Sequence, residues 1–183
     1  MSTRLLEPRP AKTGVPASAP AASEVLRWLD RLMDTTAEIY LTGCRLILGG
    51  VMFTHATQKV FGWFGGAGWS ASLQGFREGL GIPLPFALLA IAAEFLGALG
   101  LILGLLGRGA ALGIIAVMTG AVLLVHAQNG FFMNWMGKAP GEGYEYHLLA
   151  IGLALPILAR GSGALSLDNW LLGRLRRDRS EAG

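Results

Sequence analysis

Four long apolar stretches follow one another along this chain, and they limit its fold more than any other feature. They run near 39–61, 83–106, 109–127 and 144–158. A helix needs about 20 apolar residues to cross a hydrocarbon core ~30 Å thick. Charged residues make up only 15% of the chain, whereas soluble domains carry about 25%. The sequence therefore predicts an all-α fold, a polytopic membrane four-helix bundle with four spans within residues 37–160.

The segments outside the spans are more polar. Residues 1–22 are rich in Pro, Ala and Ser, which predicts a disordered N-terminal tail rather than a signal peptide. Residues 23–36 have apolar positions at helical spacing, typical of an amphipathic helix on the membrane or of an extension of the first span. The loop 62–82 has the same spacing, which indicates a short interfacial helix. Residues 161–183 combine leucines with arginines, which favours a basic C-terminal interfacial segment over a disordered tail.

The distribution of basic residues predicts the orientation of the spans. Eleven lysines and arginines lie in the two flanks and in the short loop between the second and third spans. The other two loops, 62–82 and 128–143, contain only Arg77 and Lys138. Because basic residues favour the cytoplasmic side, we expect a multi-pass protein of the cell (inner) membrane with both termini in the cytoplasm.

Ionisable side chains inside or at the ends of the spans are the functional candidates, because a charge is costly in hydrocarbon. The candidate polar pocket comprises His55, Lys59, Glu94, His126, Glu145 and His147. The three histidines lie on different helices, each within ~10 Å of the expected outer edge. That common depth favours a pocket that opens outward. Glu145 and His147 are two residues apart and point to nearly opposite helix faces, so they cannot both face one pocket.

Two charged residues lie deeper in the predicted spans. Glu94 follows Pro83 by eleven residues, a depth of ~16 Å, and its small neighbours indicate that it faces another helix. Arg45 either pairs with Glu94 or extends its side chain to the cytoplasmic headgroups. In the second case Glu94 needs another partner, or a raised pKa that keeps it neutral.

These polar residues lie within motifs that resemble a known family. The run 49–66, GGVMFTHATQKVFGWFGG, resembles the first-span signature of the DoxX family of small membrane proteins. Further similarities, in the same order, are at 94–97, 126–132, 143–146 and 166–168. The resemblance covers about residues 43–168, and Ala56 stands where the family usually has glycine. It implies a four-helix membrane bundle, and it extends to relatives such as the DoxD subunit of thiosulfate:quinone oxidoreductase.

The first hypothesis is a small subunit of a membrane-bound, quinone-linked redox system. His55, Lys59 and His126 are the candidate quinone contacts, and Glu94 is a candidate for moving protons. The single cysteine, Cys44, and the lack of a flavin or Fe–S motif mean that electrons must come from a partner chain. The chain is then at most an oxidoreductase subunit, and we assign it no catalytic residue.

Other functions remain open. In the main alternative, the chain is a non-catalytic membrane anchor or assembly scaffold whose polar residues fasten the helices together. Haem held by His55, His126 and His147 is less favoured, because the sequence has no HxxxH or CxxCH element. A transporter is also less favoured, because no inverted repeat is visible. We expect no metal site and no nucleic-acid partner; the expected partners are the lipid bilayer, a redox protein or a second copy of the chain.

Overall fold

The computed structural model describes residues 24, 27–28 and 31–181. Within this part of the chain the secondary structure is helical and includes no strand, which confirms the predicted all-α fold class. The predicted tail 1–22 lies outside the described residues. Positions 31–33 are helical, but 34–38 are not, so a break in the helix separates them from the first long helix.

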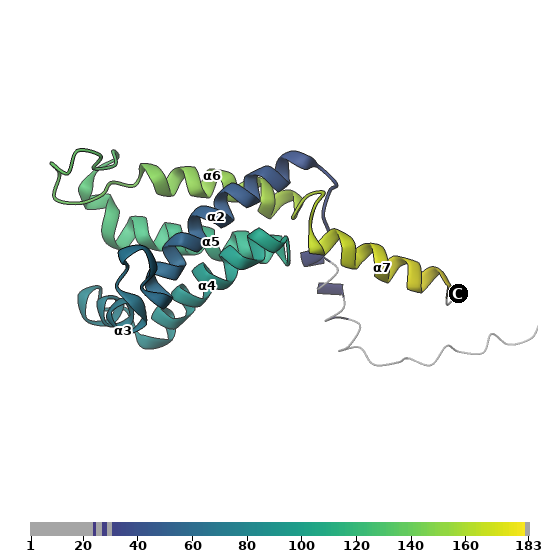
Figure 1. Cartoon of the computed structure of the whole chain (residues 1–183), viewed down its shortest axis with the longest axis horizontal. Helices are drawn as coiled ribbons and strands as arrows, with labels where there is room; N and C mark the ends of the chain where they lie inside the picture. The colour runs from purple at the N-terminus through teal and green to yellow at the C-terminus, as the bar shows by residue number, and fades with distance from the viewer. Residues whose placement is uncertain (1–23, 25–26, 29–30, 182–183) are drawn as a thin grey trace, which may run out of the picture.

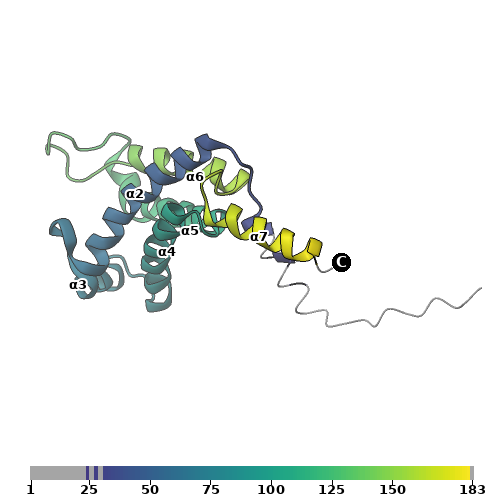
Figure 2. The same ribbon diagram turned by 45° about the vertical axis from the view of Figure 1, so that its right-hand side comes forward.

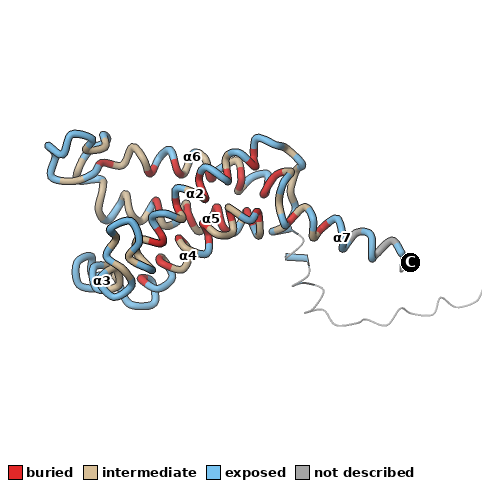
Figure 3. The backbone as a smooth tube through the Cα atoms, in the orientation of Figure 1, coloured by how far each residue is buried: buried red, intermediate tan, exposed pale blue. Residues whose placement is uncertain are grey.

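Four helices form the bundle. They are α2 (Ile39–Phe61), α4 (Leu84–Leu103), α5 (Gly107–Ala121) and α6 (Glu145–Arg160). A π-helix, η3 (Val122–His126), and a 3-10 turn, η4 (Ala127–Asn129), continue α5 to its end. α2 and α5 each pack against both α4 and α6, so the four helices close into a ring (Figure 1). The buried residues lie along the inner sides of these helices, as Figure 3 shows.

Three of these helices are long and apolar enough to cross a membrane. They comprise residues 39–61, 84–103 and 107–129. Many of their large side chains point outward, among them Leu89 and Leu123, which are 64% and 72% exposed. α6 has 16 residues, a rise of ~24 Å, and it contains Pro156. It still runs the length of the bundle beside α2 and α5 (Figure 1).

The first residues of α2 and the last residues of α6 lie at the same end of the bundle. The backbone N–H of Thr36 donates to the carbonyl of Arg160 at 3.1 Å, and that of Ala164 donates to Glu38 at 3.4 Å. α7 (Leu167–Glu181) begins at this end and extends away from the bundle in both ribbon views (Figures 1 and 2). The segment predicted as a basic interfacial helix is therefore helical.

Short elements lie at the opposite end of the bundle. They are η1 (Trp63–Gly65), α3 (Gly68–Gln74) and the π-helix η2 (Gly75–Gly79). Gly66 lets this segment fold back on α2, because a Cβ atom there would overlap the backbone of Gln58. The loop predicted to hold a short interfacial helix thus contains a short helix, and it brings Phe76 back towards the bundle.

Arg45 follows neither of the two expected alternatives. Its side chain is buried and donates to the carbonyls of Leu101 and Ile102, at 2.7 and 2.6 Å, in the last turn of α4. It also donates to the carbonyls of Ser162, at 2.9 Å, and Leu165 in the segment after α6. The last carbonyls of a helix lack intrahelical partners, so one guanidinium satisfies several of them and ties three segments together.

Asp168 completes this end of the bundle. Its carboxylate accepts hydrogen bonds from the backbone N–H groups of Leu106 and Gly107, at 2.8 and 3.1 Å, and from the hydroxyl of Ser162 at 2.7 Å. Leu106 has a φ of 51°, in the left-handed region. The carboxylate caps the N-terminus of α5, where unpaired N–H groups and the helix dipole favour a negative charge.

Candidate functional site

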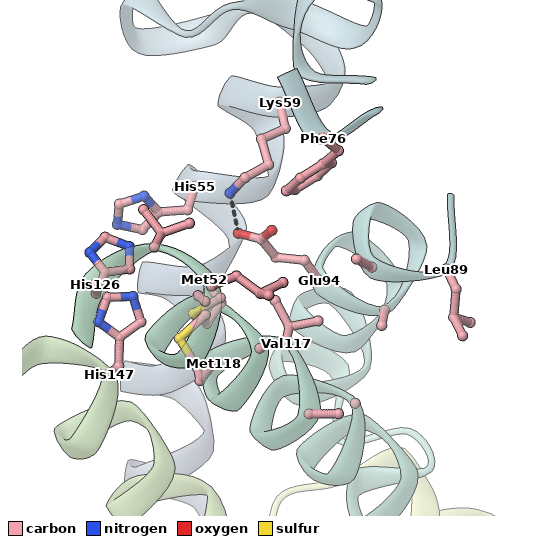
Figure 4. A pocket seen from close by; sticks show the side chains of 18 of the residues that line it. Met52, His55, Lys59, Phe76, Leu89, Glu94, Val117, Met118, His126 and His147 are labelled. Atoms are coloured by element: carbon pink, nitrogen blue, oxygen red, sulfur yellow. Dashed lines mark hydrogen bonds and ion pairs between the residues drawn. The ribbon is translucent and has the colours of Figure 1, made fainter. Parts of the chain in front are cut away.

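A cavity of about 850 Å³ opens among the bundle helices towards the end opposite Arg45. Side chains from α2, η2, α4, α5, η3, α6 and the loop before α6 line it. Most of these are apolar, and the ionisable ones gather on one side (Figure 4). Five of the six predicted pocket residues line this cavity: His55, Lys59, Glu94, His126 and His147.

Lys59 and Glu94 form an ion pair in the cavity wall. The Nζ atom of Lys59 donates to Oε1 of Glu94 at 2.7 Å, as the dashed line in Figure 4 marks. The side chain of Glu94 is only 3% exposed, whereas that of Lys59 is 32% exposed. The buried carboxylate therefore has its partner in the last turn of α2. Sequence reasoning placed both residues in the site but did not pair them, because their expected depths differed by several ångströms.

The three imidazoles lie one above another along the cavity wall (Figure 4). The ring centroids of His126 and His147 are 4.1 Å apart, and His55 packs on the ring of Tyr146 at 5.6 Å. Tyr146 also contacts His147, with 5.5 Å between centroids. These rings come from α2, η3 and α6, so the cluster exists only when the bundle is assembled.

His126 lies at the last position of the π-helix η3. A π-turn widens the helix locally and changes the direction of the side chains that follow it, and such turns are frequent at functional sites. The Nδ1 atom of His126 is 2.8 Å from the carbonyl oxygen of Glu142. A carbonyl can only accept, so Nδ1 carries the proton. In the neutral ring Nε2 is then a hydrogen-bond acceptor.

His147 has an unused polar atom. The residue is 6% exposed, and its Nδ1 atom is buried without a hydrogen-bond partner. Leaving a buried polar atom unpaired costs about 1–3 kcal/mol. His147 nevertheless lines the cavity, so other atoms of its side chain border the space that a ligand would fill.

Glu145 is the predicted pocket residue that does not line the cavity. Its Oε2 atom accepts a hydrogen bond from the backbone N–H of Met133 at 3.1 Å, so the carboxylate fastens the loop before α6. This agrees with the argument from helical spacing that Glu145 and His147 face different ways. The same loop supplies the Glu142 carbonyl that holds His126.

Phe76, Met133 and Tyr146 are among the further residues that line the cavity and that sequence reasoning did not place there. Phe76 comes from the π-helix η2 and Met133 from an irregular loop, and the spacing of residues within these segments does not show that they fold back against the bundle. Tyr146 could have been found, because it directly precedes His147 and adjacent helical positions differ by only ~100°. Its hydroxyl lies 3.4 Å from the sulfur of Met52.

Within the described part of the chain, no group of three histidine, cysteine or carboxylate side chains is arranged to hold a metal ion.

One comparison with known proteins found a similarity to a family. The model of the DoxX family matches residues 40–127, which include α2, α4 and α5 and therefore His55, Lys59, Glu94 and His126. Comparison with curated proteins gave no match, and neither did comparison with solved structures. The match confirms the resemblance for the motifs within residues 43–127, whereas the motifs at 143–146 and 166–168 lie outside it. Together with the three helices that are long and apolar enough to cross a membrane, it supports a membrane protein that is similar to the DoxX family over residues 40–127.

Proposed function

We propose that this chain is a small quinone-binding subunit of a membrane-bound redox system. The observation that carries this proposal is that three imidazoles and the Lys59–Glu94 pair gather on one side of the same apolar cavity. A quinone needs an apolar slot for its ring together with hydrogen-bonding groups for its two carbonyl oxygens. Sites for small molecules combine apolar walls with a few placed polar groups in this way.

The polar residues fit both redox states of a quinone. Lys59 can donate to a carbonyl oxygen of the oxidised form. The Nε2 atom of His126, an acceptor in the neutral ring, can receive the hydroxyl hydrogen of the reduced form. The imidazole of His147, which also lines the cavity, can donate or accept a hydrogen bond, because a neutral imidazole has one donor and one acceptor nitrogen.

Reduction of the quinone requires two electrons and two protons. The electrons come from a redox group on a partner protein, because the sequence has one cysteine and no flavin or Fe–S motif. The protons add to the two oxygens from groups that line the cavity. Glu94 and its partner Lys59 lie beside the imidazoles and can exchange protons with them. This chain then binds and orients the quinone, and the partner protein supplies the electrons.

We also propose how the chain is oriented in the membrane. α2, α4, α5 and α6 are the four crossings of the cell (inner) membrane, and both termini are cytoplasmic. The hydrogen bonds between Thr36 and Arg160 and between Glu38 and Ala164 support both flanks lying at the same end of the bundle, and the excess of basic residues in these flanks favours the cytoplasmic side. A cysteine introduced at Ser72 or Lys138 in a Cys44→Ser background should react with an impermeant maleimide in intact cells. A cysteine at Asp178 should react only after lysis, and the opposite pattern would reverse the orientation.

The direct test of function is quinone binding to the purified chain in lipid nanodiscs. Wild-type protein should bind a short-chain quinone, and His147→Phe should weaken binding about tenfold, since one hydrogen bond to the ligand is lost. Leu149→Ala is the matched control, because Leu149 lies on the same helix, is 66% exposed and does not line the cavity. No binding by the wild type, or equal binding by His147→Phe, would contradict the proposal.

A second function, that of a scaffold for a partner protein, is supported by the loop before α6. Phe132, Trp135 and Met136 are 76%, 84% and 81% exposed. The side chain of Asn134 braces this loop through two hydrogen bonds of 2.9 Å with the backbone of Ala139. If the loop docks a partner, Trp135→Ser should reduce what co-purifies from native membranes in mild detergent. A partner lost in this way, without quinone binding by the wild type, would favour the scaffold over the quinone subunit.

A further inference from the structure

A second cavity, of about 520 Å³, continues the first one along the bundle. The two share the side chains or backbone of Leu89, Ala93, Gly109 and Gly113 in their walls. Together they form a groove between α4 and α5 that leads from the imidazoles towards the α4–α5 turn. We call this the α4–α5 groove.

Small residues form the floor of the α4–α5 groove, and leucines border it. A Cβ atom at Gly109 would meet nothing within 4 Å, and one at Gly113 would lie 3.5 Å from the Cβ of Ala93. Leu89 and Leu112 beside it are 64% and 57% exposed, so the groove opens on the outer face of the bundle. In a membrane protein this face contacts lipid.

The length of the groove fits an extended chain rather than a compact ring. Gly109 and His126 are 17 residues apart along α5 and η3, a rise of ~25 Å. This distance is most of the ~30 Å hydrocarbon thickness of a bilayer. A quinone ring fills only the end of such a groove, beside the imidazoles.

An independent observation indicates a ligand rather than ordinary lipid contact. The hydrogen-bonding side chains of Lys59, His126 and His147 line the polar end of the groove, and an acyl chain cannot pair with them. The occupant must therefore carry a hydrogen-bonding head at one end and an apolar chain behind it.

We propose that the ligand is a long-chain amphiphilic quinone, which enters sideways from the lipid between α4 and α5 and lays its apolar tail in the α4–α5 groove. This inference rests on the proposed quinone function, and it adds the tail site and the route of entry. The head lies against His126 and His147, and the tail extends past Gly120 and Gly113 towards Gly109.

Substitution at Gly109 tests the tail site without touching the polar end. Gly109→Leu places a side chain in open space within the groove. Gly152→Leu is the matched control, because a Cβ atom there also meets nothing within 4 Å and Gly152 lines neither cavity. Binding to nanodiscs should be measured for two quinones with the same ring, one without a tail and one with a ten-carbon tail.

Gly109→Leu should change the affinity for the tailed quinone but not for the tailless one. Gly109→Leu should weaken binding of the tailed quinone about tenfold, equivalent to excluding about two methylene groups from an apolar site. Binding of the tailless quinone should stay within about twofold of wild type, and Gly152→Leu should change neither. Because each variant is compared with wild type for the same ligand, partition of the tail into lipid cancels.

The outcomes separate this inference from the proposed function. If neither quinone binds the wild type, the function itself is wrong. If both bind and Gly109→Leu weakens neither, quinone binding stands and the tail site is wrong. If Gly109→Leu instead changes the oligomeric state and leaves binding intact, the groove is a contact between copies of the chain, which also overturns the tail site.

Discussion

The ammonium group of Lys59 lies 2.7 Å from Oε1 of Glu94, and this pair joins the last turn of α2 to the middle of α4 in the cavity wall. The carboxylate is almost fully buried, and the ammonium is partly exposed. Removing one partner of such a pair leaves an uncompensated charge, and that costs more than the intact pair contributes.

Lys59→Met should therefore destabilise the bundle by about 3 kcal/mol, since Glu94 loses its partner. The double variant Lys59→Met with Glu94→Gln should recover most of this loss, because no buried charge remains. Reversible unfolding in mixed micelles, followed by circular dichroism, measures both. A single variant as stable as wild type would show that the pair is not coupled to the fold.

Substitution of Arg45 should lower the free energy of unfolding more than substitution of an exposed arginine. Arg45→Met leaves the last carbonyls of α4 and two carbonyls after α6 without their donor, so we expect a loss of about 3 kcal/mol or more. Arg160→Met is the control, because its side chain is 60% exposed and lies 3.7 Å from Glu38. A surface pair of this kind contributes about 0–1 kcal/mol. Equal unfolding free energies for the two variants would contradict the role of Arg45.

Asp168 should behave as a helix cap. Asp168→Ala removes the acceptor for the N–H groups of Leu106 and Gly107 and for the hydroxyl of Ser162, so we expect a loss of about 2 kcal/mol. Asp178→Ala, on the exposed side of α7, should change stability by less than about 0.5 kcal/mol. The same unfolding measurement compares them, and a neutral Asp168→Ala would remove the cap from the account.

Substitution of Gly143, which does not line the cavity, should still weaken quinone binding. A Cβ atom there would overlap the carbonyl oxygens of Gly130, Phe131 and Phe132. Gly143→Ala should displace the loop that includes Glu142, the acceptor of the His126 hydrogen bond. Quinone affinity should fall several-fold, whereas Gly152→Ala, in open space on α6, should leave it unchanged. Unchanged affinity in Gly143→Ala would show that the loop does not position His126.

The sequence was sufficient to predict the fold class, because apolar length and composition determine it. The helices α2, α4, α5 and α6 occupy the four apolar stretches. Residue counts along the helices also led to the prediction that at least His55 and His126 share a pocket, and both line one cavity together with His147. These inferences use spacing along one helix, and they need no knowledge of which helices are neighbours.

Contacts between helices were harder to predict. Arg45 was expected to pair with Glu94 or to reach the headgroups, yet its acceptors are backbone carbonyls. Backbone groups at helix ends carry no sequence signal of their own. To predict the Lys59–Glu94 pair, one must know which helices are neighbours in the ring. Phe76 reaches the cavity from a π-helix, whose side chains do not follow the regular α-helical spacing.

Photoaffinity labelling of native membranes with an azido-quinone, followed by peptide mapping, tests most directly whether this cavity binds a quinone. Peptides that contain His55, His126 and His147 should be labelled, and excess unlabelled quinone should suppress the labelling. His147→Phe should lower the yield. A quinone site in this cavity would be contradicted if only exposed residues such as Leu149 were labelled. It would also be contradicted if excess quinone did not suppress the labelling.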